Sequence, residues 1–135
     1  MQHKISKFKI KKGNDANQML LKKLVRNFVE NGSLKTTMTK ARYLKSTIET
    51  LSHSALNYKE STKNVLLPYF GTTRQVLEFV EAAKLRSMNA TGSGIVKVIK
   101  LGARMSDAVQ IGRVTWSKEL EVTKKPKAKK TDTPK

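Results

Sequence analysis

The side chains that could carry out catalysis are few, and they do not gather in the sequence. The two histidines, His3 and His53, have neither metal-ligand spacing nor an acid placed to assist them, and the chain has no cysteine. The only glycine cluster, GSG at residues 92–94, precedes a strand pattern, whereas a phosphate-binding loop precedes a helix. We therefore predict no enzyme activity, no metal site, no cofactor and no small-molecule substrate. His53 falls near the apolar seam of a predicted helix, where we expect a structural role.

The chemistry that the chain does offer is positive charge. Its 28 Lys and Arg residues outnumber 10 Asp and Glu residues, for a formal net charge of +18 over 135 residues. Residues 1–12 contain five lysines and no acid, residues 124–135 contain six lysines and one acid, and the part between them is basic as well. A basic domain with two basic ends indicates a large polyanion as partner, and nucleic acid is the usual one.

Three segments are candidate RNA- or DNA-binding sites. In HKISKFKIKK, basic residues alternate with apolar ones, which suits a segment laid along phosphates and anchored by its apolar side chains. The alternative is a membrane-surface segment, but its apolar face is small. The predicted RNA-binding residues here are His3, Lys4, Lys7, Lys9, Lys11 and Lys12.

The second segment, NGSLKTTMTKARYLKS, contains the start of a helix and no acid. Helix N-termini favour negative charge, and hydroxyls beside unpaired backbone amides can bind a phosphate there. We predict that Thr36, Thr37 and Lys40 do so; the alternative is an ordinary threonine cap with exposed lysines.

In the third segment, KVIKLGARMSD, Lys97, Lys100 and Arg104 follow a predicted strand into a hairpin loop, where they could contact nucleic acid. The alternative is that these cations only guard a sheet edge. Aromatic residues are few, so we expect recognition of backbone and shape rather than base stacking.

The elements that must position these residues follow from periodicity. Apolar residues at helical spacing predict a first helix capped by Asn14 or Asp15 and ended by Gly32. Its wide buried stripe is centred on Ala16, Leu20, Leu24 and Phe28 and flanked by Met19, Leu21, Val25 and Val29. A second helix spans residues 38–57, with Ala41, Leu44, Ile48, Leu51 and Ala55 as its seam. A short helix at residues 62–67 is capped by Ser61 and disturbed by Pro68, and a fourth begins at a Thr72/Gln75 capping box.

The C-terminal half changes to the period of strands. Two β-branched runs predict antiparallel strands at residues 95–101 and 109–117, with a bulge near Gly112 and Arg113, and SLKTT can add a third strand. We predict an α+β fold, with three to four helices on one face of a small, about three-stranded mixed sheet. The expected organisation is a basic extension (1–13), one RNA-binding domain (14–118) and a lysine/proline-rich tail (119–135). No apolar run approaches the about 20 residues of a membrane span, and we expect a cytoplasmic protein with no membrane partner.

Three motifs together resemble the bacterial family of large-subunit ribosomal protein seventeen. They are Met1, His3 and Lys4 at the start, Thr36, Thr37, Lys40 and Ala41 at the second helix, and Gly94, Lys97, Val98, Arg104 and Asp107 late in the chain. The sequence departs from the family pattern at Gln2, at Ile95 and Val96, and at Met105 and Ser106.

The resemblance implies a structural protein of the large subunit with an α+β fold and no catalytic activity. It also implies binding to large-subunit ribosomal RNA near the nascent-chain tunnel exit, contacts with neighbouring ribosomal proteins, and a place on cytoplasmic ribosomes. The residues alone leave a nucleoid or DNA-compacting protein as the alternative, and an enzyme acting on RNA as a weaker one.

Overall fold

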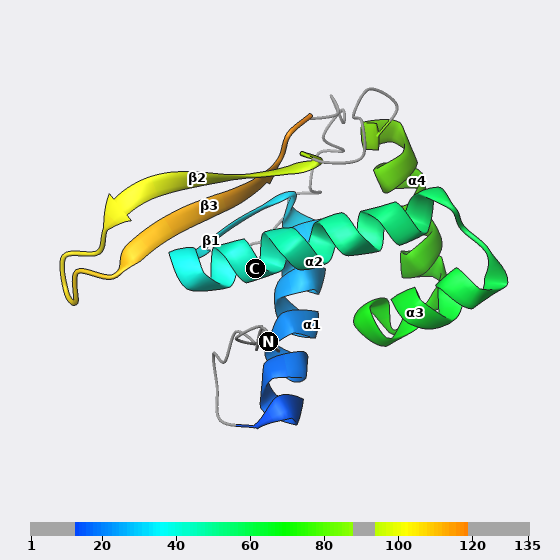
Figure 1. The fold of residues 1–135 in the computed structure, drawn as a ribbon, viewed down its shortest axis with the longest axis horizontal. Helices are drawn as coiled ribbons and strands as arrows, with labels where there is room; N and C mark the ends of the chain where they lie inside the picture. Colours follow the sequence, from blue (N-terminus) through cyan, green and yellow to red (C-terminus); the bar gives the residue numbers. More distant parts are fainter. Residues whose placement is uncertain (1–12, 88–93, 119–135) are drawn as a thin grey trace, which may run out of the picture.

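The computed structural model describes residues 13–87 and 94–118, so the predicted sites at residues 3–12 and the whole predicted C-terminal tail (119–135) lie outside the described residues. Four helices and three strands follow one another along this part of the chain (Figure 1). In order they are α1 (Asn14–Asn31), β1 (Ser33–Thr37), α2 (Met38–Leu56), α3 (Glu60–Phe70), α4 (Thr73–Ser87), β2 (Val96–Ala103) and β3 (Gln110–Trp116).

The strands form one sheet in the order β1-β3-β2, which confirms the α+β class and the role of SLKTT as a third strand. Both pairings are antiparallel, so the expectation of a mixed sheet was wrong. The hairpin β2–β3 is antiparallel by its short connection, and β1 joins the free edge of β3 in the opposite direction. Figure 1 shows the hairpin extending past the start of α2.

The predicted bulge lies on the other strand of the hairpin. The pairing register between β2 and β3 shifts on β2 between Lys100 and Gly102, whereas β3 pairs with β1 without interruption from Ile111 to Thr115. The phase change in the apolar pattern of β3 has a simpler cause. Ile111 points to one face of the sheet, and Val114 points to the other, which is buried.

Helix α2 lies at the centre of the core, and all five residues of its predicted seam are buried. Helix α1 was predicted less accurately. Its buried residues, Leu21, Val25 and Phe28, all belong to the predicted stripe and its flanks. Ala16 and Leu20 are only half-buried, and the flanking Met19 is 72% exposed. The fully buried Phe28 packs on Trp116 of β3 with ring centroids 4.7 Å apart, which ties α1 to the sheet.

The helix ends show which capping signals were correct. Gly32 is left-handed (φ 72°) and its N–H donates to the Phe28 carbonyl, as predicted for a C-terminal cap. The N-terminal cap of α1 is Gly13 rather than Asn14 or Asp15. The Thr72 hydroxyl accepts a hydrogen bond from the Gln75 N–H at 3.4 Å, which is the predicted half of a capping box.

Helix α3 is longer than predicted at both ends. It begins after Lys59 rather than Ser61, and it contains Pro68 in its last turn. Proline removes one backbone donor, but in the last turn it does not end the helix, which continues to Phe70. Gly71 then caps the helix, and its N–H donates to the Leu67 carbonyl at 2.7 Å. The ring of Phe70 then packs on Phe79 of α4, with centroids 4.8 Å apart. A local glycine cap therefore ends this helix, and its last residue joins it to α4.

His53 does not occupy the core, so its predicted structural role was wrong. The neighbouring Ser52 faces inward and is fully buried, while His53 is exposed on the opposite side of α2. A helix turns by about 100° per residue, so one position is enough to move a side chain from the seam to the surface.

Candidate nucleic-acid interface

The start of α2 is joined to the sheet without any intervening loop. Strand β1 ends at Thr37, and the same residue is the N-cap of α2, with extended backbone angles (φ −63°, ψ 149°). Its side chain makes no capping hydrogen bond, and the first turn contains no acid. The first backbone amides of α2 therefore lack the side-chain acceptor that usually satisfies them, which leaves them suited to an external anion.

The strand register brings Lys100 to this helix start. Thr36 pairs with Gly112 of β3, and Gly112 pairs in turn with Lys100 of β2, so the three residues form one row across the sheet. Alternation along β2 places Lys100 on the same face as the core residues Val96 and Val98. Two separately predicted sites, Thr36 and Lys100, thus belong to one region.

Gly112 holds this row close to the helix because it has no side chain. A Cβ atom built on Gly112 would lie 2.5 Å from the Met38 Sδ and 3.3 Å from the Val98 Cγ1. Met38 is the first residue of α2, so its side chain fills the space above Gly112. The half-buried Lys40 follows in the same first turn and adds the cation predicted there.

Lys97 lies on the opposite face of the sheet, so the third predicted segment is divided between two surfaces. Its row contains Thr115 and Ser33, and the next row on the same face contains Ile99, Arg113 and Lys35. Thr115 is buried although alternation places it on this outer face, and its hydroxyl has no partner within the described residues. The open part of the outer face is therefore formed by Lys97, Ile99, Lys35 and the half-buried Arg113.

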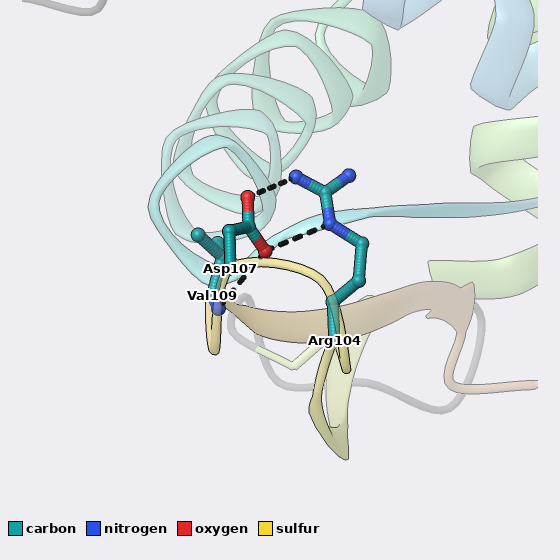
Figure 2. A network of polar contacts seen from close by, with 3 residues as sticks. All are labelled: Arg104, Asp107 and Val109. Atoms are coloured by element: carbon teal, nitrogen blue, oxygen red, sulfur yellow. Dashed lines mark hydrogen bonds and ion pairs between the residues drawn. The ribbon is translucent and has the colours of Figure 1, made fainter.

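Arg104 is held within the hairpin. Its Nε donates to Asp107 Oδ1 at 2.9 Å and its second amino group bonds Asp107 Oδ2, a two-point ion pair shown in Figure 2. Asp107 Oδ1 also accepts the Val109 N–H at 3.3 Å, which supports the turn containing Ala108 at φ 54°. The hydrogen bond from Arg104 lowers the pKa of Asp107 to about 2, and Asp107 in return raises the pKa of Arg104. This geometry assigns Arg104 a part in shaping the loop.

The charges of the described residues are distributed unevenly over the elements. Acids occur in all four helices and in the hairpin turn, but β1, β2 and β3 contain none. The strands contain four cations: Lys35, Lys97, Lys100 and Arg113. None of these four belongs to an ion pair within residues 13–87 and 94–118. The sheet is thus the most uniformly positive part of the described structure.

One further cation is positioned by an aromatic ring. The Arg86 guanidinium of α4 lies 4.2 Å from the centre of the Trp116 ring, and one of its amino groups donates to the Ala82 carbonyl at 3.3 Å. Burial lowers the pKa of Arg86, and this arrangement serves to pack α4 against the end of β3.

Sequence reasoning missed Lys35 and Arg113. Each lies in a segment that was predicted to be a strand, so the period of two already assigned each to a face of its own strand. The missing information was the pairing of β1 with β3, which sets the two cations directly opposite each other. Among the described residues there is no cluster of three or more metal-ligating side chains. No helix of the described part is long and apolar enough to cross a membrane.

Comparison with known proteins places the chain in a family. The family model described as ribosomal protein L17 matches residues 20–116, which include every described strand and most of the helical residues. The chain therefore belongs to the ribosomal protein L17 family, whose members are structural rather than enzymatic components of the ribosome.

The curated relatives have the same family name, and the match covers nearly the full length of each. The chain is 28% identical to the large ribosomal subunit protein bL17 of Neorickettsia sennetsu over 117 residues, covering 86% of this chain and 99% of the relative. It is 27% identical to bL17 of Thermotoga neapolitana over 122 residues (84% and 92% covered) and 28% identical to bL17 of Nautilia profundicola over 118 residues (82% and 93% covered).

Proposed function

We propose that this protein is a structural constituent of the large ribosomal subunit that binds and stabilises large-subunit ribosomal RNA. Membership of the L17 family and relatives named as large-subunit proteins support the assignment to that subunit. The observation that favours RNA as the ligand is the acid-free sheet, with four cations that no described acid neutralises. Such surfaces bind phosphate backbones through charge and counterion release.

The binding mode that the geometry supports is backbone recognition. The α2 start offers amide donors, the Thr36 and Thr37 hydroxyls, and the cations Lys40 and Lys100 from two different elements. The exposed strands present no aromatic platform, because Trp116 is buried against Phe28 and covered by Arg86. Contacts of this kind position a protein on folded RNA without reading its bases.

The proposed place on the subunit is near the nascent-chain tunnel exit, with neighbouring ribosomal proteins as further partners. This part of the proposal is supported by the family resemblance alone. The basic segments at residues 1–12 and 119–135 are proposed to extend the contact with RNA, in agreement with their composition. Crosslinking of lysines to RNA and to protein neighbours in purified subunits tests both the place and the partners.

Sucrose-gradient sedimentation of a cell lysate tests the assignment to the subunit. At physiological salt we expect the protein to sediment with large subunits, and at high salt we expect it to be released because phosphate contacts weaken steeply with ionic strength. A protein that stays at the top of the gradient at physiological salt contradicts the proposal. Competition between large-subunit RNA and duplex DNA tests the nucleoid alternative, and tighter binding to DNA would favour that reading.

A further inference from the structure

The outer face of the sheet contains an arrangement of charge that works against folding unless a ligand compensates it. Lys35 of β1 and Arg113 of β3 are directly paired in the antiparallel register. Directly opposed side chains in such a pair have Cβ atoms roughly 5 Å apart, and like charges at that spacing destabilise the sheet. No acid of the described residues forms an ion pair with either one.

The neighbours of this pair extend the positive surface without neutralising it. Arg113 is paired on its other side with Ile99, which is 43% exposed, and Lys97 stands diagonally from Arg113 one row away. Ser33 is exposed in the row of Lys97 and adds a hydroxyl next to Lys35 along β1. The face therefore offers three cations and a hydroxyl around one exposed apolar side chain, and no acceptor side chain besides hydroxyls.

We infer that Lys35, Arg113 and Lys97 form a second phosphate-binding surface, separate from the α2 start, on which a backbone segment of ribosomal RNA lies across β1, β3 and β2. A phosphate between Lys35 and Arg113 turns a repulsive pair into two attractive contacts, and Arg113 can bind it with two parallel hydrogen bonds. Ile99 lies where a ribose would pass between successive phosphates. The inference rests on the proposed function and deepens it.

The two basic surfaces lie on opposite faces of the same sheet. The Thr36–Gly112–Lys100 row belongs to the face that carries Val96 and Val98, whereas the Lys35–Arg113–Ile99 row belongs to the other face. Because α2 covers the buried part of the inner face, RNA on that side would contact only the row at the α2 start, and a separate RNA segment would lie on the outer face. An exposed acidic protein segment could also pair with the outer face, but membership of a ribosomal protein family favours RNA backbone.

The test is a binding series on the full chain with purified large-subunit RNA as the probe. The variant Lys35→Gln/Arg113→Gln removes two cations from the outer face. The matched control, Lys23→Gln/Lys59→Gln, removes two exposed cations from α1 and from the start of α3. We expect the face variant to bind several-fold more weakly, with a slope of log affinity against log salt smaller by about 2. The control should change both values far less.

A stability measurement distinguishes a lost RNA contact from a folding defect as the cause of weaker binding. Lys35→Gln should raise the melting temperature of the free protein by about 1–3 °C, because it removes the repulsion from Arg113. Lys35→Glu should fold at least as well, since it places an acid opposite Arg113, and yet bind RNA more weakly than Lys35→Gln. A stabilised protein with weakened RNA binding is a combination that a purely structural role of Lys35 does not produce.

The outcomes separate this inference from the proposed function. If the wild type binds large-subunit RNA and the face variant binds it as the control does, the outer face is no RNA site and the inference is overturned. Retained RNA binding together with lost binding to polyglutamate would overturn it in favour of an acidic protein partner. If the wild type binds no large-subunit RNA at physiological salt, the proposed function and the inference fail together.

Discussion

Gly112 is a point of close approach between the sheet and the start of α2, and its replacement by alanine tests that geometry. The new Cβ would lie 2.5 Å from the Met38 Sδ, where nonbonded heavy atoms normally stand about 3.5–4.0 Å apart. The Val98 Cγ1 at 3.3 Å and the Ile99 carbonyl oxygen at 3.5 Å limit movement in the other directions. The Met38 side chain must therefore move by about 1 Å or more.

The expected cost follows from two opposing effects. Overpacking a well-filled site costs typically 1–3 kcal/mol, and replacing a strand glycine by alanine returns about 0.5–1 kcal/mol of backbone entropy. We expect Gly112→Ala to lower the free energy of unfolding by about 1 kcal/mol. For a domain near 100 residues, that corresponds to a melting temperature lower by roughly 4–8 °C. Urea unfolding followed by circular dichroism measures the change.

A double-mutant cycle with Met38→Ala shows whether the contact is the cause. Shortening Met38 removes the atom that the new Cβ meets, so Gly112→Ala should be neutral or stabilising in the Met38→Ala background. The coupling energy should then be about 1 kcal/mol, with the double variant more stable than the sum of the two single changes predicts. If Gly112→Ala leaves stability unchanged in the wild-type background, or if the two changes add independently, the close approach described here is incorrect.

Three further predictions concern the α2 start, the hairpin and the packing of α4. Lys40→Glu should stabilise the isolated protein by a few tenths of a kcal/mol through the helix dipole and weaken RNA binding. A filter-binding assay in which affinity is unchanged would show that the α2 start takes no part in RNA binding. Asp107 has a folded pKa of about 2, below its ordinary 3.8, so its support of the hairpin is complete above pH 3.8 and disappears as the pH falls through about 2. Amide exchange of Val109 should report this loss. The variant Asp107→Asn should show no such pH dependence. Arg86→Ala should cost about 1 kcal/mol in urea unfolding through the lost ring contact, and an equally stable Arg86→Ala variant would assign that contact no energetic role.

Local patterns in the sequence were sufficient for the elements themselves. The α2 seam, the Gly32 cap, the Thr72 cap and the three strands all depend on residues within a few positions of one another, and each was predicted correctly. The exposed Met19 shows what periodicity leaves open. It flanks the predicted stripe of α1, but its exposure depends on which neighbour the helix meets, and periodicity alone does not contain that information.

The sequence by itself determined that this is a basic α+β protein with a helix start that lacks an acid, because composition, period and capping residues are local properties. Only the tertiary structure decided how the cations are grouped. Strand order and register paired Lys35 with Arg113 and placed Lys100 in one row with Thr36 and Gly112. The physical reason is that side chains alternate across a strand, so the surface each cation joins depends on which distant strand lies beside it.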